Sequence, residues 1–308
     1  MPGAQGELKV PAPASRGARG GNAAPWLLMT PAFVYYAVFW LLPVAGGIVE
    51  IFTALDGSFT LTGNFRLMWQ SDLFLRSVTN TALFAVISVT LQYLIAMTLA
   101  VILNIKFKFS NILMFIAMIP MAITPTAVAI LWKIGLFKDG WINSILMGLG
   151  FVRENILFLG AEGFSALLMI ILIDTWTVTP SVMIILSAGL QGIQKELLEA
   201  AWSFGANKWR IFADITLPIL RPSIITSVIL RFISAVQVWA IVVMTLGHGR
   251  VPFLVERIAF YEDVIPGVPT SGKLAFALSF TTTAIVFLAT MAYYHFSRRG
   301  TAYQEAQR

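Results

Sequence analysis

The residues from 164 to 221 decide the fold: FSALLMIILIDTWTVTPSVMIILSAGL at 164–190, followed by QGIQKELLEAAWSFGANKWRIFADITLPILR at 191–221. The first part carries a single charged side chain, Asp174. It is longer than the ~20 apolar residues that an α-helix needs to cross a hydrocarbon layer about 30 Å thick. The second part is polar and charged. An apolar block that ends at a charged loop predicts a membrane-spanning helix followed by an exposed connection.

The rest of the chain repeats this pattern. Apolar residues make up 58% of the 308 positions and charged residues only 12%, about half the charged fraction of an average soluble domain. The apolar residues are gathered in blocks long enough to span a bilayer. These blocks lie at 26–48, 81–104, 112–132, 164–190, 222–246 and 273–296. The sequence therefore predicts an all-α, polytopic membrane protein with six transmembrane helices.

The charged residues at the ends of the spans predict a topology. Residues 1–25 are rich in Gly, Ala and Pro and lack hydrophobic periodicity, as disordered tails do. The first span is too long for a removable signal peptide, so we interpret it as a retained anchor. The short loop after the second span carries Lys106 and Lys108 without an acid, which is typical of a cytoplasmic loop. With six spans, both the 1–25 tail and a C-terminal tail at 299–308 are then cytoplasmic and flank a membrane domain at 26–298.

Several functions are excluded by composition. The chain has no cysteine and only two histidines, His248 and His295, which lie far apart and outside any metal-binding motif. The basic residues are not gathered with aromatic residues, which argues against a nucleic-acid-binding surface. The spans contain no paired acids or nucleophile with a neighbouring base, so a membrane-embedded enzyme is not supported. We expect no catalytic residues, no cofactor and no metal site.

The polar segment at 191–221 has its own pattern. Helix-forming residues surround Glu196, Gly205 interrupts them, and Pro218 is expected to end a second short helix. The small residues Ala200 and Ala201 permit close approach of another protein. Two interpretations remain open from the residues alone: an amphipathic helix at the lipid interface, or a knob that docks into a cleft of another protein.

This segment resembles the EAA loop of permeases of binding-protein-dependent ABC importers. Phe204 departs from the family pattern, which usually has Asp before the glycine. Sugar-type permeases also resemble this chain at Gly63-Asn64-Phe65, Asn80-Thr81, Pro120, Pro125, Trp132, Gly140, Asn143, Trp176 and Pro180. The residues that match the EAA loop in type and spacing are Glu199, Ala200, Ala201, Gly205, Ile215, Leu217 and Pro218.

The resemblance implies a type I ABC importer permease fold in the bacterial inner membrane. It implies that residues 191–221 form a coupling loop seated in a cytoplasmic ATPase subunit, which hydrolyses the ATP. It also implies a second homologous permease subunit, two ATPase subunits and an extracytoplasmic solute-binding protein. The solute would be a carbohydrate or related polyol, moved by alternating access.

The candidate substrate path begins with two ionisable residues, Asp174 and Arg231, which lie about equally deep in the fourth and fifth spans. A charged group at this depth normally faces a partner or a water-filled cavity. The pair is therefore either a structural ion pair or part of the path. Hydroxyl, amide and indole groups nearby suit sugar binding. The full candidate set is Asp174, Trp176, Thr177, Arg231, Ser234, Gln237 and Trp239.

A secondary transporter driven by an ion gradient is the alternative. Such a protein would also show intramembrane charges and broken helices. It gives no reason for the EAA-like segment.

Overall fold

The computed structural model describes residues 23–54, 56–159, 163–262 and 271–305. Within these ranges the regular secondary structure is helical, and the extended backbone forms one isolated bridge between Thr53 and Phe59. The all-α prediction is confirmed. The predicted 1–25 tail lies almost entirely outside the described residues.

In the N-terminal unit, which extends to Val49, the described residues form one long apolar helix that ends just beyond the unit, at Ile51. It comprises α1 (Ala23–Tyr36), a π-helical turn η1 (Ala37–Leu41) and α2 (Leu42–Ile51). The wide turn ends two residues before Pro43, which has no backbone N–H to donate to a regular helix. Together these elements give a 27-residue candidate span, in agreement with the predicted first span.

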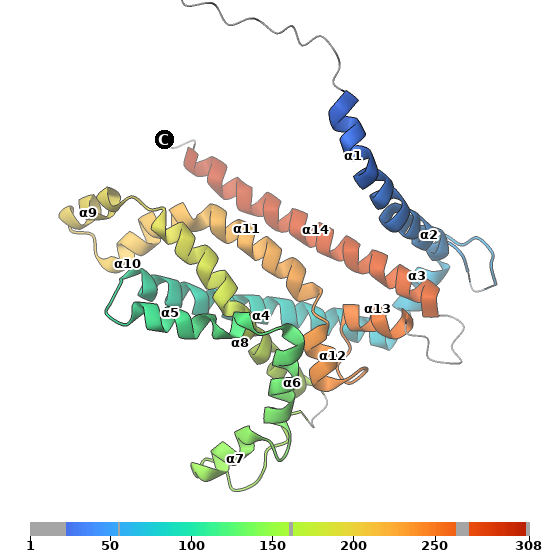
Figure 1. Cartoon of the computed structure of the whole chain (residues 1–308), viewed down its shortest axis with the longest axis horizontal. Coiled ribbons are helices and arrows are strands. Elements are labelled where there is room, and N and C mark those ends of the chain that lie inside the picture. Colours follow the sequence, from blue (N-terminus) through green and yellow to red (C-terminus); the bar gives the residue numbers. More distant parts are fainter. Residues whose placement is uncertain (1–22, 55, 160–162, 263–270, 306–308) are drawn as a thin grey trace, which may run out of the picture. The chain divides into compact units, whose positions relative to one another are not determined.

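The second unit begins at Glu50 and is organised around α8. More than half of the apolar window of α8 is buried, 56%, against 28% for α4, so α8 is the central helix. It packs most extensively against α4, and α11 packs against both of them (Figure 1). α14 packs against α11 and α13. The four long elements are α4 (Asp72–Asn104), α8 (Phe164–Gln191), α11 (Leu217–Val236) and α14 (Ser271–Glu305).

The third span is bent. α5 (Ser110–Met118) leads into a 3-10 turn, η2 (Ile119–Ala122), and α6 (Pro125–Leu136) then turns away by 96°. The apolar block at 112–132 predicts one continuous helix here, whereas in the structure Pro120 lies in the 3-10 turn and Pro125 begins α6. Five helices in the described residues are long and apolar enough to cross a membrane, and the count is six if this bent pair is one span.

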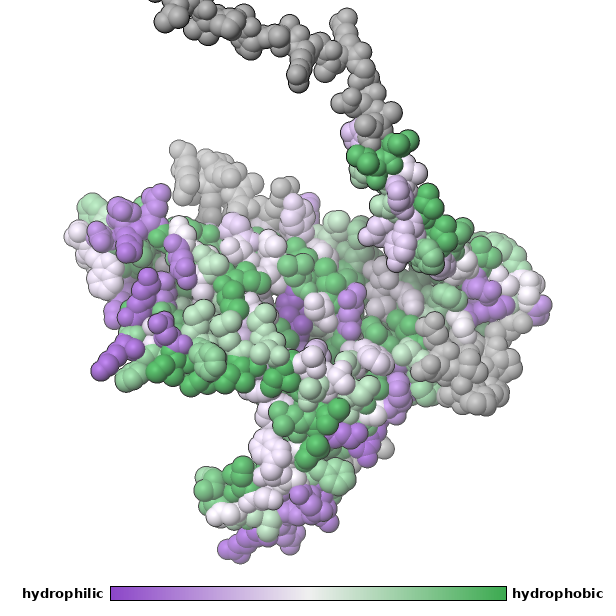
Figure 2. Space-filling view, viewed as in Figure 1, coloured by the Kyte–Doolittle hydropathy of each residue, from purple (hydrophilic) through white to green (hydrophobic). Residues whose placement is uncertain are grey.

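Short helices complete the unit. Figure 2 shows apolar side chains over the long helices and hydrophilic side chains gathered around α9 and α10 and around α7. This distribution fits spans that cross a membrane and short helices at its surfaces. The short helices are α3 (Gly63–Trp69), α7 (Trp141–Gly148), α9 (Lys195–Ser203), α10 (Lys208–Ile211), α12 (Ala240–Leu246) and α13 (Leu254–Glu262).

Two amide side chains, of buried Asn64 and half-buried Asn80, hold the connections between helices. Asn64 Nδ2 donates to the carbonyl oxygens of Ile51 and Thr53, at 2.8 and 3.0 Å. Asn80 Nδ2 donates to the carbonyl of Pro252 at 3.0 Å. A carboxamide supplies the hydrogen bonds that irregular backbone would otherwise lack in a buried position. Asn64 and Asn80 therefore determine how α3 and the loop before α13 are held.

A carboxamide, that of Asn143, also holds the backbone on both sides of α7. Asn143 Nδ2 donates to the carbonyls of Lys138 and Ile156, both at 2.9 Å, and its Oδ1 accepts the N–H of Ile156 at 3.0 Å. Gly140 starts α7 where the backbone passes so close that an added Cβ would lie 2.3 Å from the carbonyl oxygen of Ile134. Only glycine fits at this position without a shift of the backbone.

Candidate functional site

A polar cluster lies inside the helical bundle. Arg231 on α11 forms an ion pair with Asp174 on α8. Gln92 on α4 donates through Nε2 to Asp174 Oδ2 at 2.8 Å, and accepts through Oε1 from Arg231 Nε at 2.6 Å. Ser88, one turn earlier on α4, donates its hydroxyl to the same carboxylate oxygen. These four residues, the polar cluster, tie α4, α8 and α11 together.

The polar cluster is enclosed by protein. Ser88 and Gln92 are fully buried, and the side chains of Asp174 and Arg231 are only 4% and 10% exposed. A buried charge is tolerated when an opposite charge and further hydrogen bonds compensate for lost hydration. Of the two interpretations of this pair, the structure has Asp174 and Arg231 in contact with each other. Ser88 and Gln92 were missed in the sequence analysis, although two polar residues four apart in an apolar span were a usable signal.

Two further candidates on α8 also face protein. Thr177 is buried, and its hydroxyl donates to the carbonyl of Ile173 at 2.8 Å. The half-buried ring of Trp176 packs edge-to-face against Trp132, with centroids 5.4 Å apart. Trp176 thus contributes to packing between α8 and α6, whereas the Thr177 hydroxyl is satisfied within α8.

The remaining candidates on the fifth span, Ser234, Gln237 and Trp239, are exposed. α11 ends at Gln237, and α12 begins after Trp239, so helical geometry is interrupted within a long apolar segment. Gln237 is exposed and Trp239 is 36% exposed. Exposed Thr226 and Ser234 precede them at near-helical spacing on α11. The side of α11 that this chain leaves uncovered therefore carries three polar residues, Thr226, Ser234 and Gln237, which are called the polar stripe of α11, with exposed Leu230 between the first two.

The helix break between Gln237 and Trp239 limits what can lie against this part of the span. Broken helices are tolerated within a membrane only where protein buries them or where they line a water-filled cavity. The polar stripe and the break at Gln237–Trp239 therefore need a partner or a cavity rather than lipid.

The 191–221 segment forms a helix, a turn and a second helix. α9 ends at Ser203, and Gly205, two residues later, has a φ of +80°. The N–H of Gly205 donates to the carbonyl of Trp202 at 2.9 Å, and that of Ala206 donates to Ala201 at 3.0 Å. This is a glycine C-cap, in which the left-handed residue lets the chain reverse. Asn207 then caps α10, its side chain accepting the N–H of Arg210 at 2.8 Å.

The two faces of α9 differ. Leu198 packs against the cluster formed by the ends of α4, α8 and α11, whereas Glu199 and Ala200 are exposed. Aromatic rings next to the turn are also uncovered: Phe204 is 91% exposed and Trp209 75%. The segment is thus anchored on one face and presents a carboxylate, small residues and aromatic rings on the other.

The end of the segment differs from the sequence prediction. Pro218 was expected to end the second short helix, but the helix from Lys208 continues through α11 to Val236. A π-helical turn, η3 (Phe212–Thr216), joins α10 to α11, and Pro218 follows it within the first two residues of α11. The first turn of a regular helix tolerates a residue without an N–H. Ile215 and Pro218 are half-buried, and Leu217 is 41% exposed.

No group of three or more His, Asp or Glu side chains in the described part of the chain is arranged to hold a metal ion.

Comparison with known families identifies the chain. Residues 92–301 match the family described as binding-protein-dependent transport system inner membrane component. The chain belongs to this family. The matched range contains α8, α11 and the whole segment from α9 to α10. Membership establishes a multi-pass transport component of the inner membrane.

Similar proteins include permease subunits of two sugar transport systems. The lactose transport system permease protein LacF of Rhizobium radiobacter is 32% identical over 218 residues, which cover 70% of this chain and 73% of that protein. The trehalose/maltose transport system permease protein MalF of Thermococcus litoralis is 32% identical over 230 residues, covering 73% and 77%.

A solved structure shares the fold. A chain of the bacterial alginate ABC transporter, determined in complex with an alginate-bound periplasmic protein, superposes with a TM-score of 0.78 at 20% identity. The match covers 90% of this chain and 95% of that chain. The predicted ABC importer permease fold is confirmed.

Proposed function

We propose that this family member translocates a carbohydrate or a related polyol across the inner membrane by alternating access, driven by a separate ATPase. The observation that carries the proposal is the geometry of residues 191–221. This coupling segment presents an exposed outer face and is continuous with a transmembrane helix. We infer that two cytoplasmic ATPase subunits, a second homologous permease subunit and an extracytoplasmic solute-binding protein complete the transporter.

The exposed face of the coupling segment suits docking to the ATPase. Glu199, Ala200 and Gly205 are exposed at the end of α9, where small residues admit a close partner and the carboxylate offers a charged contact. Exposed aromatic rings such as Phe204 are frequent anchors in protein interfaces. An isolated amphipathic helix at the lipid surface would need no cap and turn of this kind.

The polar cluster connects the helix that follows the coupling segment to the rest of the transmembrane bundle. The helix that starts at Lys208 carries Arg231, whose partners lie on α4 and α8. A second contact, from the Tyr93 hydroxyl to Ser227, joins α4 to α11 about one turn of helix nearer the coupling segment. Displacement of the segment would therefore move α4, α8 and α11 together, which is the rigid-body motion that alternating access requires.

The polar stripe of α11 is the proposed wall of the substrate path, with Gln237 and Trp239 at its break. Amide, hydroxyl and indole groups provide the hydrogen bonds and the flat apolar face that a sugar ring needs. The names of the similar lactose and trehalose/maltose permeases support a carbohydrate as the solute. Ser234 belongs to this stripe, and Arg231 lies on the same helix, α11. The α8 residues Asp174, Trp176 and Thr177 then support α11 on the side away from the path.

A contact within the fold supports the proposed topology. Arg221, at the end of the coupling segment, donates through Nη2 to the carbonyl of Ser297 at 3.1 Å. The last apolar span therefore ends beside the coupling segment. If the coupling segment meets a cytoplasmic ATPase, the C-terminal residues 299–308 are cytoplasmic, and an even number of spans places residues 1–25 there too.

Affinity purification of the tagged chain from its own host tests the proposal. A nucleotide-hydrolysing subunit should be recovered with the chain, and Glu199→Ala should reduce both its recovery and sugar uptake. Glu196→Ala is the matched control, because it removes an equally exposed glutamate one turn earlier on α9. Membrane insertion, followed by immunoblot, should be unchanged in both variants.

The proposal fails if no ATPase is recovered with the chain and if the purified chain alone accumulates solute in liposomes under an ion gradient. That result would establish a secondary transporter instead.

A further inference from the structure

A second feature lies at the membrane boundary rather than in the bundle. A cavity of about 430 Å³ opens where α4 and α8 end and α5 begins. The apolar spans stop at Asn104 and Gln191 and resume at Ser110. The cavity therefore lies at the depth at which lipid headgroups meet the protein, at the same end as the coupling segment.

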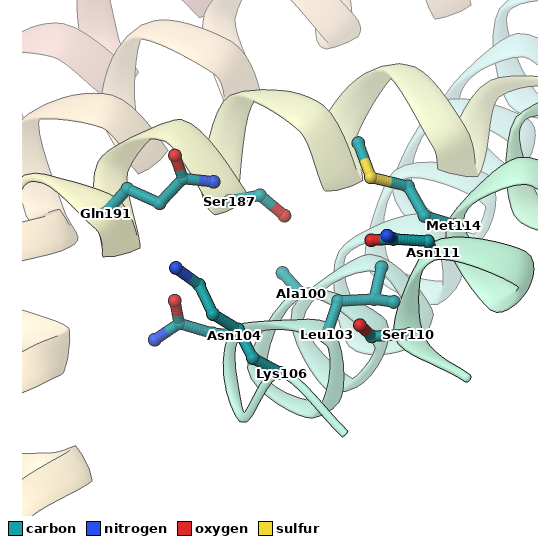
Figure 3. A pocket seen from close by; sticks show the side chains of 9 residues that line it. All are labelled: Ala100, Leu103, Asn104, Lys106, Ser110, Asn111, Met114, Ser187 and Gln191. Carbon is teal, nitrogen blue, oxygen red and sulfur yellow. The ribbon is translucent and has the colours of Figure 1, made fainter. Parts of the chain in front are cut away.

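Polar side chains converge on this cavity from separate elements. Figure 3 shows Gln191 and Ser187 reaching in from α8, Asn111 from α5, and Asn104 and Lys106 from the end of α4 and the turn that follows it. None of these five side chains makes a hydrogen bond or an ion pair with another described residue. The cavity is consequently lined by polar groups that are free to bind something else.

The charge of the lining selects among ligands. It contains one ammonium group, that of Lys106, and none of the nine lining residues is acidic. Carboxamides and hydroxyls add hydrogen-bond donors without adding negative charge. A cavity of this composition favours an anion rich in acceptor oxygens, as a phosphate group is.

The backbone at Lys106 holds the ammonium group at this position. Lys106 has a φ of +52°, the only positive φ of a residue other than glycine in the described chain. It occupies the position just after a helix end at which glycine is usual. A lysine in this conformation costs about 1 kcal/mol relative to glycine. The cost is understandable if the side chain has a role that glycine cannot fill.

Apolar side chains border the polar ones. Leu103 and Met114 belong to the lining. Beyond them, the neighbouring surface of α5 exposes Ile112 and Phe115, at 56% and 71%. A soluble phosphate would gain nothing from contact with such a surface, whereas acyl chains would pack against it.

We propose that this cavity binds the headgroup phosphate of an anionic phospholipid, whose acyl chains lie along α5. Its assignment to the cytoplasmic leaflet rests on the proposed function, because that function sets the orientation. Binding itself depends only on Lys106, the surrounding amides and the adjacent apolar surface. A bound lipid would fill the space between α4, α5 and α8 at the base of the coupling segment.

Native mass spectrometry of the full chain in neutral detergent tests the proposal, with dioleoylphosphatidylglycerol as the probe. Dioleoylphosphatidylcholine tests the requirement for net negative charge, and inorganic phosphate tests for a soluble ligand. Lys106→Gln should weaken phosphatidylglycerol binding about five-fold, because one lysine near a lipid surface contributes about 1 kcal/mol. The nearly isosteric Asn111→Asp should weaken it more than ten-fold, since it places a carboxylate against the phosphate. Lys108→Gln, in the same loop but outside the cavity lining, should change it less than two-fold.

Equal binding of the two phospholipids, or unchanged binding in both cavity variants, would overturn the proposal. Full displacement of phosphatidylglycerol by millimolar inorganic phosphate would also overturn it, by assigning the cavity to a soluble anion. The ATPase takes no part in this measurement. A failure here therefore leaves the coupling proposal standing, and loss of ATPase recovery would not alter the lipid result.

Discussion

Replacing Asp174 with asparagine should destabilise the bundle severely. Asparagine keeps the size and one acceptor oxygen, so the variant removes the charge with little change in packing. Arg231, whose side chain is only 10% exposed, would lose its counter-charge. Removing one member of a buried ion pair typically costs about 3–5 kcal/mol, because the remaining charge stays desolvated.

The expected magnitude lies within this range. Ser88 and Gln92 both donate to the Asp174 carboxylate, and the single acceptor oxygen of asparagine would be shared by the same donors. Gln92 still accepts from Arg231 Nε at 2.6 Å, which partly compensates the orphaned guanidinium. We therefore expect a loss of about 4 kcal/mol in the free energy of unfolding.

A double-mutant cycle separates the ion pair from packing. The free energy of unfolding of the full chain in micelles should be measured for Asp174→Asn, Arg231→Gln and the double variant. Each single change should cost several kcal/mol, and the double variant should cost about 2–3 kcal/mol less than the sum, because residues in one network couple by this amount. Ser234→Ala on the exposed stripe of α11 is the control and should change stability by less than about 0.5 kcal/mol.

Additive single effects would refute the reasoning, since two charges that do not depend on each other show no coupling energy. A loss below about 1 kcal/mol for Asp174→Asn would refute it as well, because the site would then be hydrated rather than enclosed.

Three further changes have defined outcomes. Gly140→Ala should lower the thermal unfolding midpoint, with a cost of about 1–3 kcal/mol from overpacking against backbone, whereas Gly148→Ala, which has no atom within 4 Å of the added Cβ, should not. Asn143→Ala should remove about 3 kcal/mol, at about 1 kcal/mol per lost hydrogen bond, and speed amide exchange in the loop after α6. The Ser58 hydroxyl and N–H hold the pKa of Asp56 below its ordinary value of 3.8. This contribution is complete above pH 3.8 and is lost as the pH falls through the lowered pKa, so Ser58→Ala should raise that pKa in an NMR titration.

The positions of the spans could be predicted because span length and apolarity are set by the thickness of the bilayer. The bend in the third span could not be predicted in the same way. Pro120 and Pro125 signalled a disturbed helix, but the 96° angle depends on how α6 packs against α12. The break at Gln237 was likewise invisible, because nothing between Ser234 and Trp239 is a strong helix breaker.

The polar cluster was only half predictable. Equal depth suggested that Asp174 and Arg231 could meet, but depth alone does not tell which way a side chain points around its helix. Ser88 and Gln92 were missed for that reason, since a serine or glutamine in a span often faces its own backbone or another helix. Pro218 was misjudged because the widened turn before it cannot be read from local propensity.

The unbroken run of helix from Lys208 into α11 constrains how the chain can vary in length. Each residue added to a helix rotates everything beyond it by about 100°. A one-residue insertion between Pro218 and Arg231 would swing the guanidinium away from its carboxylate and turn the polar stripe toward a different neighbour. Only changes of about seven residues, two full turns, would restore the register. They would also change the length of the helix between Pro218 and Arg231 by about 10 Å. Related sequences should therefore keep the spacing from Pro218 to Arg231 fixed.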